Sequence, residues 1–205
     1  MPTPVKFWDR IAERYSRRPI ADEAAYQKKL EVTRHYLRPD MEVLELGCGT
    51  GSTAIKHAPF VRHIRAVDIS SKMIEIARTR ANGVANVTFE QASVEDLEVK
   101  EGSVDAVFTL SLLHLLNDKE SAIARIKEIL KPGGIFVSST ACLGDTMKWF
   151  KIVAPIGQFL GLIPTVNTFT VQELVNSLID AGFEIDCQWQ PGPGKAVFIV
   201  AKKHD

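Results

Sequence analysis

Val43-Leu44-Glu45-Leu46-Gly47-Cys48-Gly49-Thr50-Gly51 is the stretch that decides the predicted fold. Its first four residues form a short, apolar-rich strand candidate, and three glycines at alternate positions follow that strand directly. A helical pattern begins at Ser52, so the chain must turn sharply from strand to helix. Because glycine lacks a Cβ atom, it allows a ligand to approach the backbone closely. The stretch therefore predicts a nucleotide-type pocket at the carboxyl end of a strand.

Outward from this turn, strand and helix candidates alternate along the chain. Asn117, with Glu120 three residues later, indicates a capping box that opens a helix, and Lys131-Pro132-Gly133-Gly134 ends that helix. The alternation favours a parallel sheet with helices on both faces. Further strands are predicted over residues 64–67, 87–89, 104–110 and 135–139, and a further helix over 70–81.

The pattern changes in the last third of the chain. Residues 143–169 are rich in aromatic and aliphatic side chains, interrupted by proline and glycine, and we interpret them as a lid insertion. Thr170 and Glu173 form a second capping box, which predicts another helix. Residues 183–189 and 196–201 then indicate a terminal pair of antiparallel strands.

Composition narrows the class of protein. The chain has 205 residues, 45% of them hydrophobic, which is enough for one well-packed core and favours a single domain. Its 25 basic and 25 acidic residues balance, so we do not expect a nucleic-acid partner. Cys48, Cys142 and Cys187 are scattered, which predicts no metal site and suits a cytoplasmic protein. No apolar run is long enough to predict a transmembrane segment.

Asp68 ends the second predicted strand, where a carboxylate can accept hydrogen bonds from both hydroxyls of a ribose. The glycine spacing also distinguishes between cofactors. A dinucleotide fingerprint would place glycine at position 52, where this chain has Ser52. The stretch therefore disfavours a nicotinamide dinucleotide.

Four motifs together resemble the class I S-adenosylmethionine (SAM)-dependent methyltransferases, in particular the small-molecule branch that includes the ubiquinone and menaquinone biosynthesis enzymes. They are VLELGCGTG at 43–51, AVDIS at 66–70, VDAVFTLSLLHLL at 104–116 and LKPGG at 130–134. The resemblance implies an α/β fold with a Rossmann-like, doubly wound, seven-stranded and mostly parallel sheet that ends in an antiparallel strand pair. With an N-terminal helical cap over 1–40 and the lid over 143–169, we expect one domain over 1–205.

The resemblance also implies which residues contact SAM and its product S-adenosyl-L-homocysteine (SAH). The glycine turn would hold the methionine end, Glu45 its amino group and Asp68 the ribose. Ser93 stands where many relatives carry an aspartate that faces the adenine amino group, so only an uncharged acceptor is expected there. The full set of implied contacts is Tyr15, Glu45, Gly47, Cys48, Gly49, Gly51, Asp68, Ile69, Met73, Ser93, Val94, Leu110 and Ser111.

For the transfer itself, the sequence offers few candidate groups. A sulfonium methyl is already electrophilic, so the protein chiefly aligns donor and acceptor in a dry pocket. His114 follows the fourth predicted strand, and we hypothesise that it acts as a base or orients the acceptor. The acceptor is expected to be a small, partly apolar molecule that binds lid residues Trp149, Phe150, Val153 and Phe159, although these side chains could equally cap the core.

Several alternatives remain open at this stage. A SAM-binding regulatory protein would carry the same cofactor motifs, and a lipid methyltransferase with peripheral membrane contact would also suit an apolar lid. The sequence does not distinguish carbon, nitrogen and oxygen acceptors, nor a monomer from a homodimer.

Overall fold

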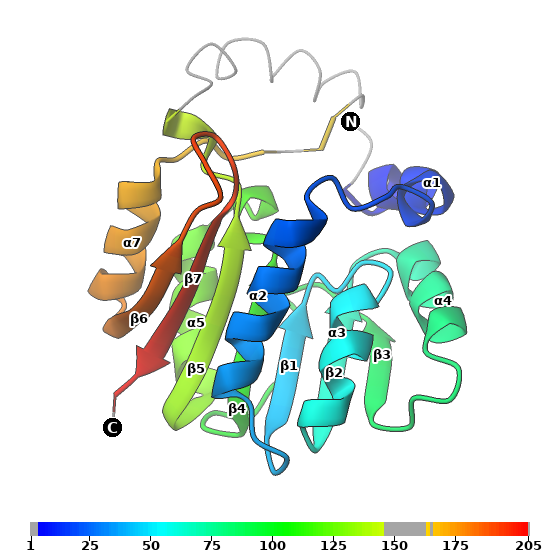
Figure 1. Ribbon diagram of the computed structural model, residues 1–205, viewed down its shortest axis with the longest axis horizontal. Coiled ribbons are helices and arrows are strands. Elements are labelled where there is room, and N and C mark those ends of the chain that lie inside the picture. The colour runs from blue at the N-terminus through cyan, green and yellow to red at the C-terminus, as the bar shows by residue number, and fades with distance from the viewer. Residues whose placement is uncertain (1–3, 146–162, 165, 205) are drawn as a thin grey trace.

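The computed structural model describes residues 4–145, 163–164 and 166–204 (Figure 1). Its strands are β1 (Glu42–Leu46), β2 (His63–Asp68), β3 (Val87–Gln91), β4 (Val104–Leu110), β5 (Leu130–Thr140), β6 (Phe183–Trp189) and β7 (Val197–Lys203). Its α-helices are α1 (Pro4–Ser16), α2 (Glu23–Tyr36), α3 (Ser52–His57), α4 (Ser71–Arg80), α5 (Lys119–Ile129) and α7 (Val171–Asp180). Short 3-10 turns follow α3 at Ala58–Phe60, β4 at Leu113–Leu115 and β5 at Leu143–Asp145.

The strands form one seven-stranded sheet in the order β3-β2-β1-β4-β5-β7-β6. The strands β1 to β5 pair in parallel, whereas β7 is antiparallel to both β5 and β6. The predicted α/β class, the mostly parallel sheet and the terminal antiparallel pair are therefore confirmed. The order reverses at β1, where the chain continues first to β2 and later to β4, and ligands of open α/β sheets bind at such a switch point.

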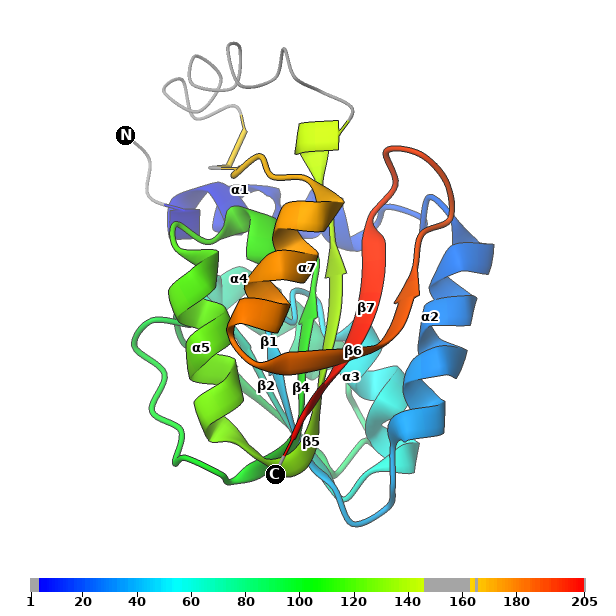
Figure 2. The same cartoon turned by 90° about the vertical axis from the view of Figure 1, so that its left-hand side faces the viewer.

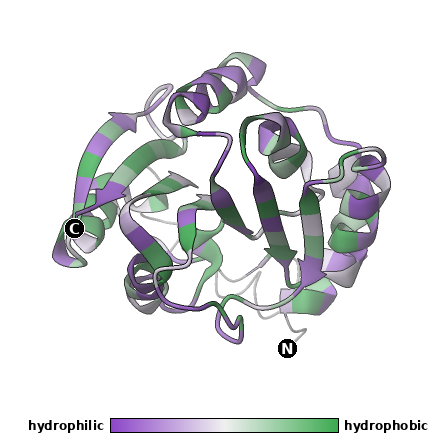
Figure 3. Cartoon of the chain, turned by 90° about the horizontal axis from the view of Figure 1, so that it is seen from below, coloured by the Kyte–Doolittle hydropathy of each residue, from purple (hydrophilic) through white to green (hydrophobic). Residues whose placement is uncertain are grey.

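Each face of the sheet carries its own hydrophobic core. Along β1, Leu44 and Leu46 belong to the core beneath α5 and α7, whereas Val43 belongs to the core beneath α3 and α4. Successive side chains of a strand point to opposite faces, so Glu45 faces the same side as Val43. Figure 2 shows α5 and α7 on one side of the sheet and α2 and α3 on the other, and Figure 3 shows the helices surrounding the strands.

Side-chain caps fix where the helices begin. The capping box at Thr170 and Glu173 is confirmed, because the Thr170 hydroxyl accepts from the Glu173 backbone N–H and the Glu173 carboxylate accepts from the Thr170 N–H. The capping box predicted at Asn117 is wrong. Asp118 is the N-cap of α5, since its carboxylate accepts from both the backbone N–H and the hydroxyl of Ser121.

The segment after α5 also differs from the prediction. Leu130 pairs with Val104, and the next pair along the two strands is Ile135 with Ala106, so residues 131–134 bulge out within β5. Gly133 has φ +69°, a backbone conformation that glycine adopts without strain. The predicted turn is thus a bulge inside a longer strand.

Candidate active site

The three glycines after β1 all adopt positive φ, with values of 69° at Gly47, 54° at Gly49 and 76° at Gly51. A Cβ atom at Gly51 would lie 2.7 Å from the Phe89 ring, and one at Gly47 would lie 2.8 Å from Leu112. At Gly49 a Cβ atom would meet no described atom within 4 Å. Two glycines therefore serve packing as well as backbone geometry, and Gly49 leaves open space for a ligand.

Asp68 holds this turn at the end of β2. Its Oδ2 accepts from the Gly49 N–H at 2.9 Å, and its Oδ1 accepts from the Ser70 N–H at 2.9 Å. Burial raises the pKa of Asp68, while these two hydrogen bonds lower it. A carboxylate has about four lone-pair positions, so two bonds leave room for two further donors such as ribose hydroxyls.

A cavity of about 480 Å³ lies over the ends of β1, β2 and β4, and we call it the acidic cavity. Its acidic side chains are Asp68, Glu95 and Asp96, and it has no lysine, arginine or histidine among its described lining residues. Of the predicted SAM contacts, the structure brings ten together here: Tyr15, Gly47, Gly49, Asp68, Ile69, Met73, Ser93, Val94, Leu110 and Ser111.

Asp96 is a lining residue that sequence reasoning missed. The Ser93 hydroxyl donates to the Asp96 carboxylate at 2.8 Å and accepts from the Asp96 N–H at 3.0 Å. The loop therefore presents a carboxylate to the cavity, although Ser93 stands where many relatives carry an aspartate. A serine followed three residues later by an aspartate is a pattern in which the serine hydroxyl bonds to the nearby backbone. This pattern could have indicated Asp96 from the sequence alone.

Helix α1 is tied to the site from its middle and from its carboxyl end. The Asp9 carboxylate accepts from the Ser70 hydroxyl at 2.6 Å and from the Lys72 N–H at 3.2 Å, at the start of α4. Arg80 donates to the Ser16 carbonyl at 2.5 Å and to the Thr50 hydroxyl at 2.6 Å. These contacts explain why Tyr15, in the last turn of α1, lines the cavity despite its distance from the glycine turn in the sequence.

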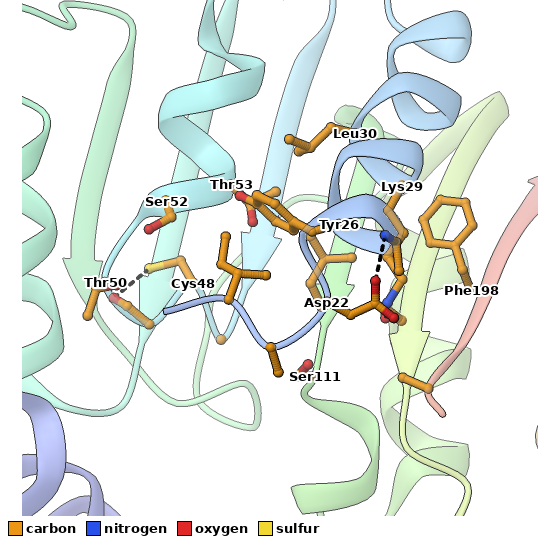
Figure 4. A pocket seen from close by; sticks show the side chains of 18 of the residues that line it. Asp22, Tyr26, Lys29, Leu30, Cys48, Thr50, Ser52, Thr53, Ser111 and Phe198 are labelled. Carbon is orange, nitrogen blue, oxygen red and sulfur yellow. Dashed lines mark hydrogen bonds between the residues drawn. The ribbon is translucent and has the colours of Figure 1, made fainter. Parts of the chain in front are cut away.

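A second cavity of about 560 Å³ adjoins the first on the α2 and α3 side of the sheet (Figure 4). It shares five lining residues with the acidic cavity: Tyr15, Gly47, Gly49, Leu110 and Ser111. Its lysine and arginine lining residues are Arg18, Lys29, Arg80 and Lys195, and its acidic ones are Asp22 and Glu45. His57 also lines it, but burial lowers the pKa of this ring to about 4, so it is neutral at pH 7. We call it the basic cavity.

Glu45 and Cys48 line the basic cavity rather than the acidic one. Burial, with the nearby charge of Asp68 as the second cause, raises the pKa of Glu45 to about 8. Its Oε2 is buried and has no hydrogen-bond partner among the described residues. An unpaired carboxylate oxygen beside a glycine turn fits the ammonium group of an amino acid. Burial also raises the pKa of Cys48, so the thiol is not a nucleophile at neutral pH.

Ser111 lies where the two cavities meet. It has φ +67° and is the one non-glycine residue with positive φ in the part of the chain that the structure describes. Its backbone N–H donates to the Ser139 carbonyl at 2.7 Å, so pairing with β5 helps to hold the unusual conformation. Such strain costs about 1–3 kcal/mol and is concentrated at functional sites.

His114 is not among the described residues that line either cavity. It lies in the 3-10 turn Leu113–Leu115, where burial lowers its pKa to about 4 and leaves the ring neutral at pH 7. Its backbone carbonyl accepts from the Asn167 N–H at 2.7 Å. A group with so low a pKa is a weak base, and the proposed proton transfer stays a prediction.

The remaining predicted contacts fall into two groups. Gly51 lines neither cavity and packs against Phe89. The predicted substrate contacts Trp149, Phe150, Val153 and Phe159 lie outside the described residues. Within residues 4–145, 163–164 and 166–204, no helix has the length and hydrophobicity to cross a membrane, and no cluster of metal-ligating side chains occurs.

A glycine turn after β1, an acid at the end of β2 and a cavity over both define the class of Rossmann-like proteins that bind a nucleotide cofactor. The family model of the methyltransferase domain matches residues 43–134. The uncharacterized methyltransferase sll0829 of Synechocystis is 31% identical over 170 residues, which are 82% of this chain and 71% of that protein. The chain therefore belongs to the class I SAM-dependent methyltransferases, whose cofactor is SAM.

Two other comparisons find a similar sequence and a similar fold. The ubiquinone/menaquinone biosynthesis C-methyltransferase of Shewanella piezotolerans is 27% identical over 180 residues, which are 77% of this chain and 72% of that protein. The crystal structure of YcgJ from Bacillus subtilis has the same fold, with a TM-score of 0.71 over 87% of this chain and 99% of that chain at 17% identity. In sequence comparisons the chain spans 40% of the full length of YcgJ and 41% of another curated relative.

Proposed function

We propose that this protein transfers a methyl group from SAM to a small acceptor that binds in the basic cavity. The observation that carries the proposal is the shared wall of the two cavities, where Gly47, Gly49, Leu110 and Ser111 face both spaces. A donor in one cavity and an acceptor in the other would meet at this wall. Both volumes lie within the range of about 300–1,000 Å³ that is usual for small-ligand sites.

The acidic cavity suits the adenosine part of the donor. Asp68 would bind the ribose hydroxyls and Asp96 the adenine amino group, because both carboxylates line the cavity and can accept hydrogen bonds. The apolar side chains of Ile69, Met73 and Val94 line the same cavity and would pack against the adenine ring. Glu45 would bind the amino group of the methionine part.

When bound, SAM supplies a methyl carbon that accepts an electron pair from the nucleophile, while the carbon–sulfur pair returns to sulfur and SAH forms. The protein's part is to hold the acceptor in line and to exclude water. A nucleophile that carries a proton must also lose it. Gly47, Gly49, Leu110 and Ser111 of the shared wall offer no candidate base, and Glu45, with a pKa of about 8, lines only the basic cavity. We therefore propose an acceptor that needs little help from a base, or one whose proton leaves to water.

The test is incubation of the purified protein with SAM that carries a trideuterated methyl group and with a cell extract depleted of other proteins. We expect SAH to accumulate and one or more small molecules to gain the label, as measured by mass spectrometry. The matched control is the Asp68→Asn variant, which should form neither product at the same SAM concentration. If the protein binds SAM but forms no SAH with any extract, the regulatory alternative replaces this proposal.

A further inference from the structure

Four basic side chains line the basic cavity, and none of them forms an ion pair with a carboxylate in the described part of the chain. The two acidic lining residues do not balance them. Glu45 is largely protonated at neutral pH because burial raises its pKa to about 8. Asp22, the N-cap of α2, whose Oδ1 accepts from the Ala25 N–H at 3.0 Å, supplies one carboxylate against the four basic side chains. The cavity therefore has excess positive charge.

Lys29 is the basic side chain for which this imbalance matters most. It reaches from α2 to the end of β5, where its Nζ donates to the Ser139 hydroxyl at 2.8 Å. An ammonium group has three donors, and this neutral hydroxyl is the one hydrogen-bond partner found for it among the described residues. Lys29 is half-buried; burial lowers its pKa, and the nearby charge of Asp22 opposes this shift without forming an ion pair with it. In such a half-buried place an anion beside Lys29 would be stabilised more strongly than one at an exposed lysine.

Lys29 lies at the opposite side of the basic cavity from the glycine turn. Ser139 lies near the end of β5, and the sheet order places β4 between β5 and β1. Neighbouring strands are about 4.8 Å apart, so the ends of β5 and β1 are roughly 10 Å apart. Figure 4 shows Lys29 and Phe198 on one side of the cavity and Thr50 and Ser52, beside the glycine turn, on the other. Arg80 lies on the latter side, where it donates to Thr50 and Ser52.

We propose that the methyl acceptor carries a carboxylate or a similar anionic group, and that Lys29 binds this group at the β5 end of the basic cavity. The inference rests on the proposed function, because it assigns a substrate class to the same site. Leu30 and Phe198 line the cavity near Lys29 and would contact the uncharged body of the acceptor. The anchored group would thus be distinct from the atom that receives the methyl group at the shared wall.

The experiment uses the full-length protein, trideuteromethyl-SAM and cell extract, followed by purification of the labelled product. We expect this product to be retained on an anion-exchange column at pH 7.5. With the purified acceptor, Lys29→Met should raise the KM for the acceptor about tenfold or more, as expected for a lost charge-assisted hydrogen bond, and should leave the affinity for SAH unchanged. Lys29→Arg should restore part of the loss, because it keeps the positive charge.

The matched control is Lys28→Met, which removes a lysine from the same helix. Lys28 is exposed, lies over the Trp189 ring at 4.2 Å and does not line the cavity, so the KM should not change. A labelled product that is neutral or cationic at pH 7.5 would overturn the inference but not the proposed function. Weaker SAH binding by Lys29→Met would also overturn the inference and leave the proposed function standing, since Lys29 would then bind the carboxylate of the donor. A complete absence of labelled product would refute both.

Discussion

The two cavities share a wall yet differ in charge. The acidic cavity has three carboxylates and no basic side chain among its described lining residues, whereas the basic cavity has four basic side chains and two acidic ones. A sulfonium donor with hydroxyl and amino groups to be bound suits the first, and an anionic acceptor suits the second. One fold can therefore form two neighbouring sites of opposite charge, because the residues that line them come from opposite sides of the glycine turn.

Two glycines of the turn after β1 test this comparison, because Gly49 lines both cavities and Gly51 lines neither. Gly51→Ala should lower the free energy of unfolding by about 3–4 kcal/mol, because it adds backbone strain and a clash with Phe89. Gly49→Ala should cost about 1–2 kcal/mol from strain alone, because its Cβ atom enters open space, but it should weaken SAH binding strongly. Urea denaturation and calorimetric titration measure the two effects. Equal losses of stability in the two variants would contradict the assigned roles.

Asp68→Asn tests the acidic cavity. An amide cannot accept on both sides, so the variant should lose charged hydrogen bonds to the ribose and bind SAH about 100-fold more weakly. Titration calorimetry of SAH measures the change. Asp40→Asn is the control, since Asp40 is exposed and lines neither cavity. SAH binding by Asp68→Asn within about threefold of the unchanged protein would argue against ribose recognition by this residue.

The pH dependence of stability tests the raised pKa of Glu45. Its folded-state pKa of about 8 lies above its ordinary value of 4.5, so in this range the folded protein binds more protons than the unfolded chain. Stability should therefore fall as the pH rises from 6.5 to 8, by up to about 2 kcal/mol for this group. Glu45→Gln should remove most of that slope in urea denaturation. The buried histidines His57 and His114 oppose this slope near pH 6.5, because their pKa values of about 4 keep the folded rings neutral while unfolded histidine, with its ordinary pKa of 6.5, is still partly protonated. The difference between the unchanged protein and Glu45→Gln therefore isolates the contribution of Glu45.

The same residue links pH to ligand binding. If the ammonium group of the donor pairs with Glu45, binding at pH 7 should release about one proton, because the pairing favours the ionised carboxylate. Titrations of SAH in buffers with different ionisation enthalpies measure this release. Glu45→Gln should release none, and an unchanged proton count in that variant would place the titrating group elsewhere.

The smallest effect is expected at His114. A general base contributes about 100-fold to 10,000-fold to a rate, whereas we expect His114→Asn to change kcat by less than about threefold, since the ring lines neither cavity. SAH affinity should not change. Rates with the identified acceptor, measured from pH 6 to 8, decide the matter: a loss of about 100-fold with intact SAH binding would restore the residue as a base.

Local patterns in the sequence pointed to residues that the structure brings together around the acidic cavity, and their contacts with the donor stay a prediction. The glycine turn, Asp68 and the residues that follow β3 and β4 each lie directly after a strand, and parallel strands bring their carboxyl ends to one edge. The capping box at Thr170 was equally visible, because it involves residues three apart. The one-residue error at Asn117 arose because Asn and Asp are nearly equivalent as N-caps, so packing of the helix decides between neighbouring candidates.

The sequence by itself thus determined the fold and the family and indicated the residues of the acidic cavity, since these depend on strand periodicity and on short motifs at strand ends. Only the tertiary structure decided the basic cavity. Its key contact joins Lys29 and Ser139, which are 110 residues apart, and the contact of α1 with α4 joins Asp9 and Ser70 across 61 residues. No local pattern predicts such pairs, because they form where the twisted sheet brings separate helices over the same strand ends.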